Sequence, residues 1–140
     1  MEHARTTAGD RWPSAEDAFA EGLRIRREMF GDDTTDGQVG GASGFAWPLQ
    51  DTVTRWCFGE VWSREELDRP TRSMLTIGLL VALGQPAQVR VHVRGAIENG
   101  VTVDQIREVL LHSMVYAGVP RAVDGFQAAR ETLVELGYEV

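Results

Sequence analysis

The pattern of apolar and polar positions along the chain predicts a series of helices. In the first, Phe19, Leu23, Arg26 and Phe30 recur at helical spacing, after a capping pattern that begins at Ser14. Further helices are predicted to begin near Asp51, Ser63, Asp68, Pro86, Thr102 and Arg121. No Asn-Gly turn joins two alternating apolar runs, as a β-hairpin requires. The pattern therefore predicts an all-α fold.

Residues 88–100, QVRVHVRGAIENG, are ambiguous on their own. Three valines alternate with Arg, His and Arg in the first half, which is typical of a half-buried strand. The flanks favour a helix over residues 86–99, because Pro86 suits a first helical turn and a capping box follows Asn99-Gly100 at Thr102. On a helix His92 shares a face with apolar neighbours, whereas on a strand it is solvated between two arginines.

The length of 140 residues predicts a single domain over 1–140, with residues 1–13 flexible. Residues 32–47 are rich in Gly, Asp and Thr and are predicted to form a loop. Such a loop is either a mobile connector or a lid over a site.

The net charge of −7 argues against nucleic acid or an anionic membrane surface as a partner. No run of 18 apolar residues is present, so no membrane span is expected, and the N-terminus lacks the apolar stretch of a signal peptide. We therefore expect a cytoplasmic protein.

The residue types that are missing narrow the chemistry. Cys57 is the one cysteine, which excludes an intramolecular disulfide or dithiol pair. All 14 basic residues are Arg, so neither a lysine Schiff base nor a Walker-type phosphate loop is possible. With three histidines and one cysteine, a closed zinc site is not expected either. The prediction is a protein without a cofactor or metal.

Two histidines are candidates for proton transfer. His92 would lie near apolar neighbours on its helix, which can move its pKa across neutrality. His112 shares a helical stripe with Glu108 and Tyr116. Packing or a helix-face hydrogen-bond network is the structural alternative for both.

Arginines form a second candidate feature. Arg64, Arg69 and Arg72 fall close together, and Arg90 and Arg94 flank His92. Guanidinium groups bind carboxylates in a bidentate manner, so such a cluster suits an anion site. The alternative is a set of surface ion pairs, with Arg72 the exception because it opens the most apolar helix.

Glu60 stands beside Trp56 and Trp62, and a carboxylate against indoles can act as an acid or base. Equally, the tryptophans can belong to the core and Glu60 to a salt bridge. Cys57 is interpreted as a small buried hydrophobe.

Several motifs together resemble the γ-carboxymuconolactone decarboxylase family. These are LDRPTRSMLTIGLLVAL, a His four residues before Ala96, NGVT and YAGVP, in this order, and the similarity extends from about Glu21 to the C-terminus. The resemblance implies an alkylhydroperoxidase-D-like bundle of about six helices that assembles as a trimer or hexamer. It also implies that His92 is the active-site histidine.

Departures from related proteins narrow the activity further. The peroxidase branch carries Cys-x-x-Cys where this chain has Gln85 and Gln88, and its glutamate falls near Arg72 or Ser73, so no thiol peroxidase activity is expected. Relatives tend to carry PAAN where this chain has Pro120, Arg121, Ala122 and Val123, and this arginine leaves the exact substrate open.

The resemblance implies cofactor-free decarboxylation of 4-carboxymuconolactone, a dicarboxylate lactone, to β-ketoadipate enol-lactone in protocatechuate breakdown. The alternatives are a related cofactor-free enzyme for another lactone or polyketide-like substrate, and a non-catalytic helical oligomer. His92 is assigned to protonation or dienolate stabilisation and Glu60 to orienting it. The substrate-binding candidates are Arg72, Arg64, Trp62 and Tyr116.

Overall fold

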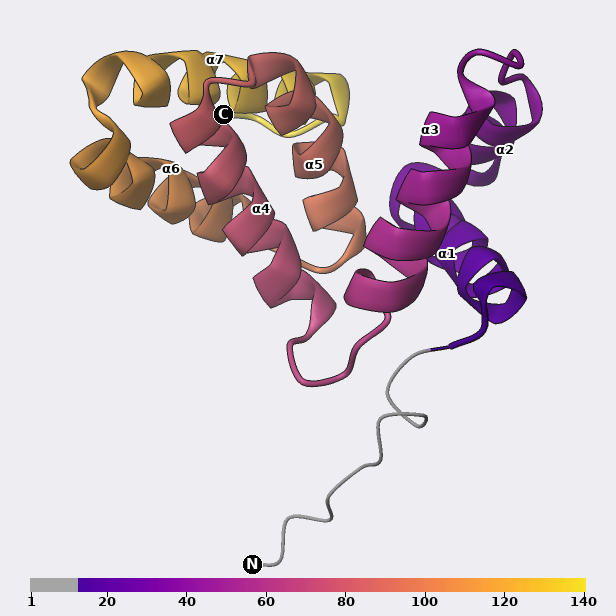
Figure 1. Ribbon diagram of the computed structural model, residues 1–140. Helices are drawn as coiled ribbons and strands as arrows, with labels where there is room; N and C mark the ends of the chain where they lie inside the picture. Colours follow the sequence, from indigo (N-terminus) through magenta and orange to yellow (C-terminus); the bar gives the residue numbers. More distant parts are fainter. Residues whose placement is uncertain (1–12) are drawn as a thin grey trace, which may run out of the picture. The chain divides into compact units, whose positions relative to one another are not determined.

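The computed structural model describes residues 13–140, and these form seven α-helices and one π-helix with no strand (Figure 1). The all-α prediction is confirmed. The prediction of a flexible N-terminus concerns residues that, except for Pro13, lie outside the described range. In chain order the elements are α1 (Ala15–Phe30), α2 (Asp32–Gly40), α3 (Trp47–Thr52), η2 (Val53–Trp62), α4 (Arg69–Leu83), α5 (Pro86–Glu98), α6 (Val103–Ala117) and α7 (Val119–Glu135).

The described chain divides into two compact units, one ending at Glu65 and one beginning at Glu66. The first contains α1, α2, α3 and the π-helix η2, and the second contains α4 to α7. We refer to them as unit 1 and unit 2. That both belong to one domain remains a prediction.

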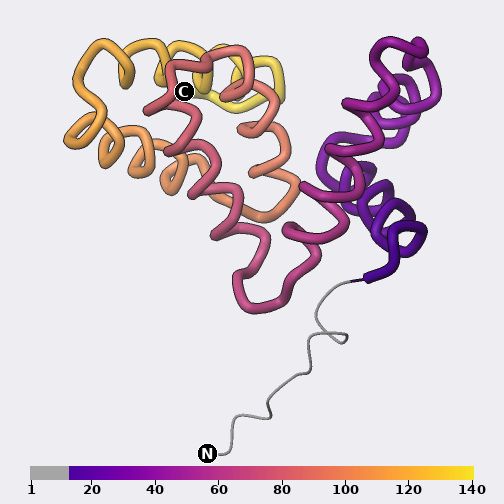
Figure 2. Tube along the Cα trace, viewed as in Figure 1, coloured from indigo at the N-terminus to yellow at the C-terminus, as the bar shows by residue number. Residues whose placement is uncertain are grey.

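In unit 1, α1 packs along η2 and the two backbones approach each other closely (Figure 2). A Cβ atom placed on Gly22 would lie 1.9 Å from the carbonyl oxygen of Thr54, and one on Gly59 would lie 1.9 Å from that of Ala18. Only glycine fits at such crossings. Beside this contact the core of unit 1 is formed by Ile25, Met29, Phe58 and Trp62.

Residues 32–47 were predicted to be a loop, and this was wrong for the part that forms α2. Thr35 and Val39 are buried on this helix, and Asp36 accepts a hydrogen bond of 2.8 Å from Nε of Arg27 on α1. These tertiary contacts stabilise a helix that its Gly and Thr content disfavours. The non-helical segment shrinks to the short connection between α2 and α3.

The predicted N-terminal caps of three helices are confirmed, and each involves a side chain and a backbone group three residues apart. Ser14 caps α1, Asp68 caps α4, and Thr102 forms with Gln105 the predicted capping box of α6. Each side chain accepts from a backbone N–H that has no partner within its helix.

Two predicted helix starts were wrong. The helix expected to begin at Asp51 begins at Trp47, and Asp51 lies inside it, where it forms an ion pair with Arg55 (2.8 Å). Ser63 does not begin a helix but follows the end of η2, where its hydroxyl donates to the carbonyl of Gly59.

Unit 2 has one core to which all four of its helices contribute. The helix α4 contacts α5, α6 and α7, and α7 also packs against α5 and α6. The helix predicted over residues 86–99 is confirmed as α5. Val89 and Val93 are buried in the core of unit 2, whereas Val91 is 40% exposed. The alternating valines therefore belong to a helix that buries two of the three. The fully or nearly buried core residues are Ile77, Val81, Val89, Val93, Ala96, Val101, Ile106, Leu110, Ala128, Ala129 and Leu133.

Within the described residues, every helix is too short or too polar to cross a membrane.

Candidate functional site

His92 lies on α5 with its imidazole half-buried beside the core of unit 2. Its neighbours on the helix, Val89, Val93 and Ala96, are fully buried, and the His92 Nδ1 atom is buried as well. Removal from water disfavours the charged form and lowers the pKa of His92 from 6.5 to about 4. At neutral pH the side chain is therefore an uncharged imidazole, with one nitrogen that donates and one that accepts.

This pKa predicts how stability depends on pH. Between pH 6.5 and 4 the unfolded chain binds a proton at His92 that the folded chain does not. The free energy of unfolding should therefore fall by up to about 3 kcal/mol as pH is lowered through this window. Above pH 6.5 the contribution of neutral His92 to stability is fully present. Urea unfolding of wild type and His92→Gln from pH 7 to 4.5 measures this. If the free energy of unfolding depended on pH equally in the two proteins, His92 would have the same pKa in the folded and unfolded states.

Arg72 lies in the first turn of α4, a helix that packs against α5. It is half-buried, and its Nε donates to the carbonyl oxygen of Leu67 at 3.0 Å. The next residue, Ser73, is fully buried and accepts a 3.0 Å hydrogen bond from Nδ2 of Asn99. The Ser73–Asn99 bond connects the beginning of α4 to the residue that caps the end of α5.

Tyr116 lies on α6 and is 80% exposed, with its ring 5.1 Å from that of His112. The predicted stripe of Glu108, His112 and Tyr116 thus forms in part, since His112 and Tyr116 touch while Glu108 contacts Arg107 at 3.5 Å. His112 also lines an open groove of about 650 Å³. The groove is lined by Met74, Asp104, Gln105, Glu108, Val109, Leu111, His112 and Val115.

The other three site candidates lie in unit 1. Trp62 is buried at the end of η2, with its ring 5.8 Å from that of Phe58, while Trp56 is 63% exposed. Glu60 and Arg64 are half-buried. The two indoles near Glu60 therefore have different environments, and only Trp62 belongs to the core.

Arg121, the departure from the family pattern, has a clear structural contact. Gly84 ends α4 in the left-handed conformation, with φ +67°. The Arg121 guanidinium lies directly over it, since a Cβ on Gly84 would be 1.3 Å from Nη1 of Arg121. The positive charge thus lies at the C-terminal end of α4, where the helix dipole favours a cation.

Two features of unit 1 were not predicted from the sequence. One is the π form of η2, and the other is the burial of Arg26, which is 4% exposed. A signal for the second was present, because Arg26 occupies a position on the apolar stripe of the first helix.

The sequence profile of the carboxymuconolactone decarboxylase family matches residues 48–131, which include η2 and most of unit 2. The chain belongs to this family. It is 37% identical over 122 residues to 4-carboxymuconolactone decarboxylase of Acinetobacter baylyi, covering 87% of this chain and 91% of the relative. It is 36% identical over 118 residues to nitrosuccinic acid decarboxylase of Metarhizium robertsii, covering 84% and 82%. Both relatives are named decarboxylases, which supports a carboxy-lyase.

Proposed function

We propose that this member of the carboxymuconolactone decarboxylase family decarboxylates 4-carboxymuconolactone to β-ketoadipate enol-lactone without a cofactor, as a step of protocatechuate breakdown. The structural observation that carries the proposal is His92, a half-buried and uncharged imidazole on a helix that packs against the one bearing Arg72. The similarity to the Acinetobacter baylyi enzyme over most of both chains supports the choice of substrate.

The reaction suits a chain without lysine. As the carboxylate leaves as CO₂, its bonding electrons pass through the ring double bond to the lactone carbonyl, so the substrate supplies its own electron sink. The protein then has to hold a dianion, stabilise the dienolate oxygen and deliver one proton to carbon.

The side chains are assigned to these tasks as follows. Arg72 and Arg64 bind the carboxylates through charge-assisted hydrogen bonds. His92 stabilises the dienolate by N–H donation or protonates it, and a bound dianion raises its pKa, because an opposite charge favours the imidazolium form. Glu60 orients His92. Trp62 and Tyr116 are proposed to line the pocket.

Nitrosuccinate is the second candidate substrate, favoured by the 36% identity to the Metarhizium robertsii enzyme. It shares the features that matter for this mechanism: two carboxylates, and a nitro group that accepts the electrons left by the departing CO₂. The resulting nitronate takes a proton on carbon to give 3-nitropropanoate. The same arginine and histidine roles apply to both substrates.

Incubation of the purified protein with each substrate in turn tests the proposal. We expect CO₂ release and loss of 4-carboxymuconolactone without added metal or cofactor. Turnover of nitrosuccinate alone would replace the first substrate by the second. Turnover of neither, by a folded protein, would favour another lactone or polyketide-like substrate or a non-catalytic oligomer.

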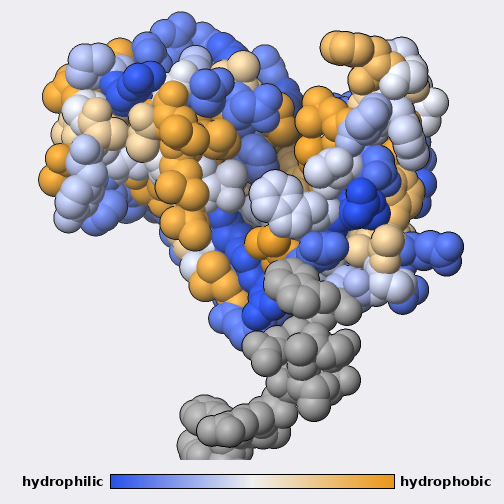
Figure 3. All heavy atoms as spheres, in the orientation of Figure 1, coloured by the Kyte–Doolittle hydropathy of each residue, from blue (hydrophilic) through white to orange (hydrophobic). Residues whose placement is uncertain are grey.

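We also propose that the protein is a homo-oligomer, a trimer or hexamer, that uses the exposed face of α4. Leu75, Leu79 and Leu83 recur one helical turn apart there and are 55%, 55% and 66% exposed. Figure 3 shows apolar residues gathered along this helix. A continuous exposed apolar stripe is typical of an interaction surface.

The substitution Leu79→Glu should lower the mass of the assembly, because it places a charge in the centre of this stripe. Size-exclusion chromatography with light scattering measures the mass of wild type and variant. Gln127→Glu, an exposed position on α7 outside the stripe, is the control and should leave the mass unchanged. A monomeric wild type would contradict the proposal.

A further inference from the structure

Arg26 of α1 carries a buried charge whose partners in unit 1 are all neutral. Its Nη1 donates to Oγ1 of Thr54 at 2.7 Å and to Oε1 of Gln50 at 3.0 Å, and its Nη2 donates to Oε1 of Gln38 at 2.8 Å. Its guanidinium carbon lies 5.8 Å from the centre of the Phe58 ring. Burial lowers the pKa of Arg26, and no described carboxylate forms an ion pair with it. A buried cation is costly unless it is well hydrogen-bonded, and these three acceptors supply the hydrogen bonds of Arg26.

These contacts converge on the junction between α3 and η2. Gln50 belongs to α3, and Thr54 is the second residue of η2. Where an α-helix becomes a π-helix, the backbone partner of a carbonyl moves from i+4 to i+5. At this junction the Gln50 carbonyl accepts from the Val53 N–H, three residues on. The Thr54 hydroxyl donates to the Gln50 carbonyl at 2.6 Å while it accepts from Arg26. Arg26 therefore orients the hydroxyl that binds this carbonyl.

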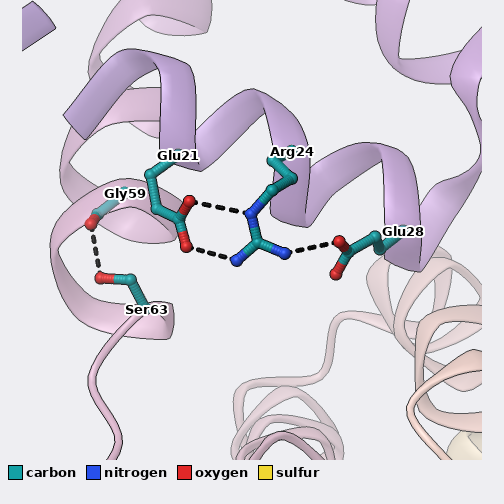
Figure 4. Close-up of polar contacts among 5 residues, drawn as sticks. All are labelled: Glu21, Arg24, Glu28, Gly59 and Ser63. Atoms are coloured by element: carbon teal, nitrogen blue, oxygen red, sulfur yellow. Dashed lines mark hydrogen bonds and ion pairs between the residues drawn. The ribbon is translucent and has the colours of Figure 1, made fainter. Parts of the chain in front are cut away.

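The backbone of α1 holds the same junction from a second side. The Thr54 carbonyl oxygen lies where a Cβ on Gly22 would be, one turn before Arg26 on α1. At the other end of η2, the Ser63 hydroxyl donates to the Gly59 carbonyl at 2.5 Å (Figure 4). A hydroxyl-to-carbonyl hydrogen bond thus marks each end of the π segment.

We propose that Arg26 is a positioning residue for the decarboxylation: acting through Thr54, it holds the α-to-π junction and so sets the direction in which Glu60 and Trp62 point. A π-helix turns less per residue than an α-helix. If the segment after Thr54 reverted to α-helix, Glu60 and Trp62 would rotate by roughly a quarter turn about the helix axis. The catalytic part of this inference rests on the proposed function of Glu60 and Trp62.

Thr54→Val and Thr54→Ser test the proposal without removing the buried charge. Valine keeps the branched shape but removes the hydroxyl, and serine restores it. With fluorotryptophan incorporated, the Trp62 resonance, assigned through Trp62→Phe, should shift in Thr54→Val and return in Thr54→Ser. For the better substrate, kcat should fall about tenfold or more in Thr54→Val with KM within about twofold, since misplaced groups impair the reaction more than binding.

Arg26→Gln and Arg24→Gln form a matched pair on α1. Arg24 is exposed, and among the described residues its ion pairs are with Glu21 and Glu28 of its own helix (Figure 4). We expect Arg26→Gln to shift the Trp62 resonance in the same direction as Thr54→Val, and Arg24→Gln to leave both resonance and kcat unchanged.

Two outcomes would overturn the inference. In one, folded Thr54→Val keeps the wild-type Trp62 resonance. In the other, the wild type is active and the Trp62 resonance moves in Thr54→Val, but kcat of this variant equals that of the wild type. If wild type decarboxylates neither substrate, the proposed function fails by itself, and the Trp62 resonance still shows whether Arg26 and Thr54 set the direction of η2.

Discussion

The His92→Gln substitution should lower kcat by about 10²–10⁴-fold, the range that a well-placed acid or base contributes. Glutamine has a similar size and can donate a hydrogen bond, but it cannot transfer a proton. Because the imidazole lies at the edge of the core, the helices should remain intact. Steady-state kinetics on 4-carboxymuconolactone and nitrosuccinate, with circular dichroism of the variant, measure both parts of this prediction.

His112→Gln is the matched control, since His112 is exposed on α6 and has no proposed catalytic task. It should retain kcat within about twofold, because the substitution of an exposed side chain changes the stability of the fold little. Near-wild-type turnover by His92→Gln would show that its assignment is wrong. A similar loss of kcat in both variants would indicate that the reaction takes place near the groove on α6.

Gly22→Ala should destabilise unit 1 by about 3 kcal/mol or more, at the upper end of the range for overpacked sites. The added Cβ would lie 1.9 Å from the Thr54 carbonyl oxygen, and both groups belong to backbones that cannot rotate away. The contact can be relieved only if α1 and η2 move apart, which exposes the Ile25 and Phe58 contacts between them.

Gly37→Ala is the control for this substitution. Gly37 also lies in a helix, α2, but a Cβ there meets nothing within 4 Å. Alanine should therefore be neutral or stabilising by about 0.5–1 kcal/mol. Urea unfolding gives both values. An unchanged midpoint for Gly22→Ala would mean that α1 and η2 do not make this close contact in solution.

Local rules predicted the parts of the fold that depend on neighbours in the sequence. Ser14, Asp68 and Thr102 cap helices through residues three positions away, so a short window of sequence contains all the information. The helix α2 could not be predicted in this way. Its composition resembles a loop, and it is held by contacts from α1 such as the one from Arg27 to Asp36.

The site shows the same division between local and distant information. The residues that flank His92 predict its place on a helix beside buried valines. The family motifs predict its importance. The low pKa of His92 depends on burial by the whole unit, which the sequence pattern does not measure. The role of Arg26 depends on Thr54, 28 positions away, and on a π-helix that apolar periodicity does not distinguish from an α-helix.

The length of η2 also bears on how such a segment can change during evolution. A π-helix of ten residues, from Val53 to Trp62, can lose or gain a residue by changing how many of its turns are π or α, while its two ends keep their places. Each such change would turn the side chains between these two ends, Glu60 among them, to a new direction. Insertions and deletions in this segment could therefore reshape what Glu60 faces without substituting that residue.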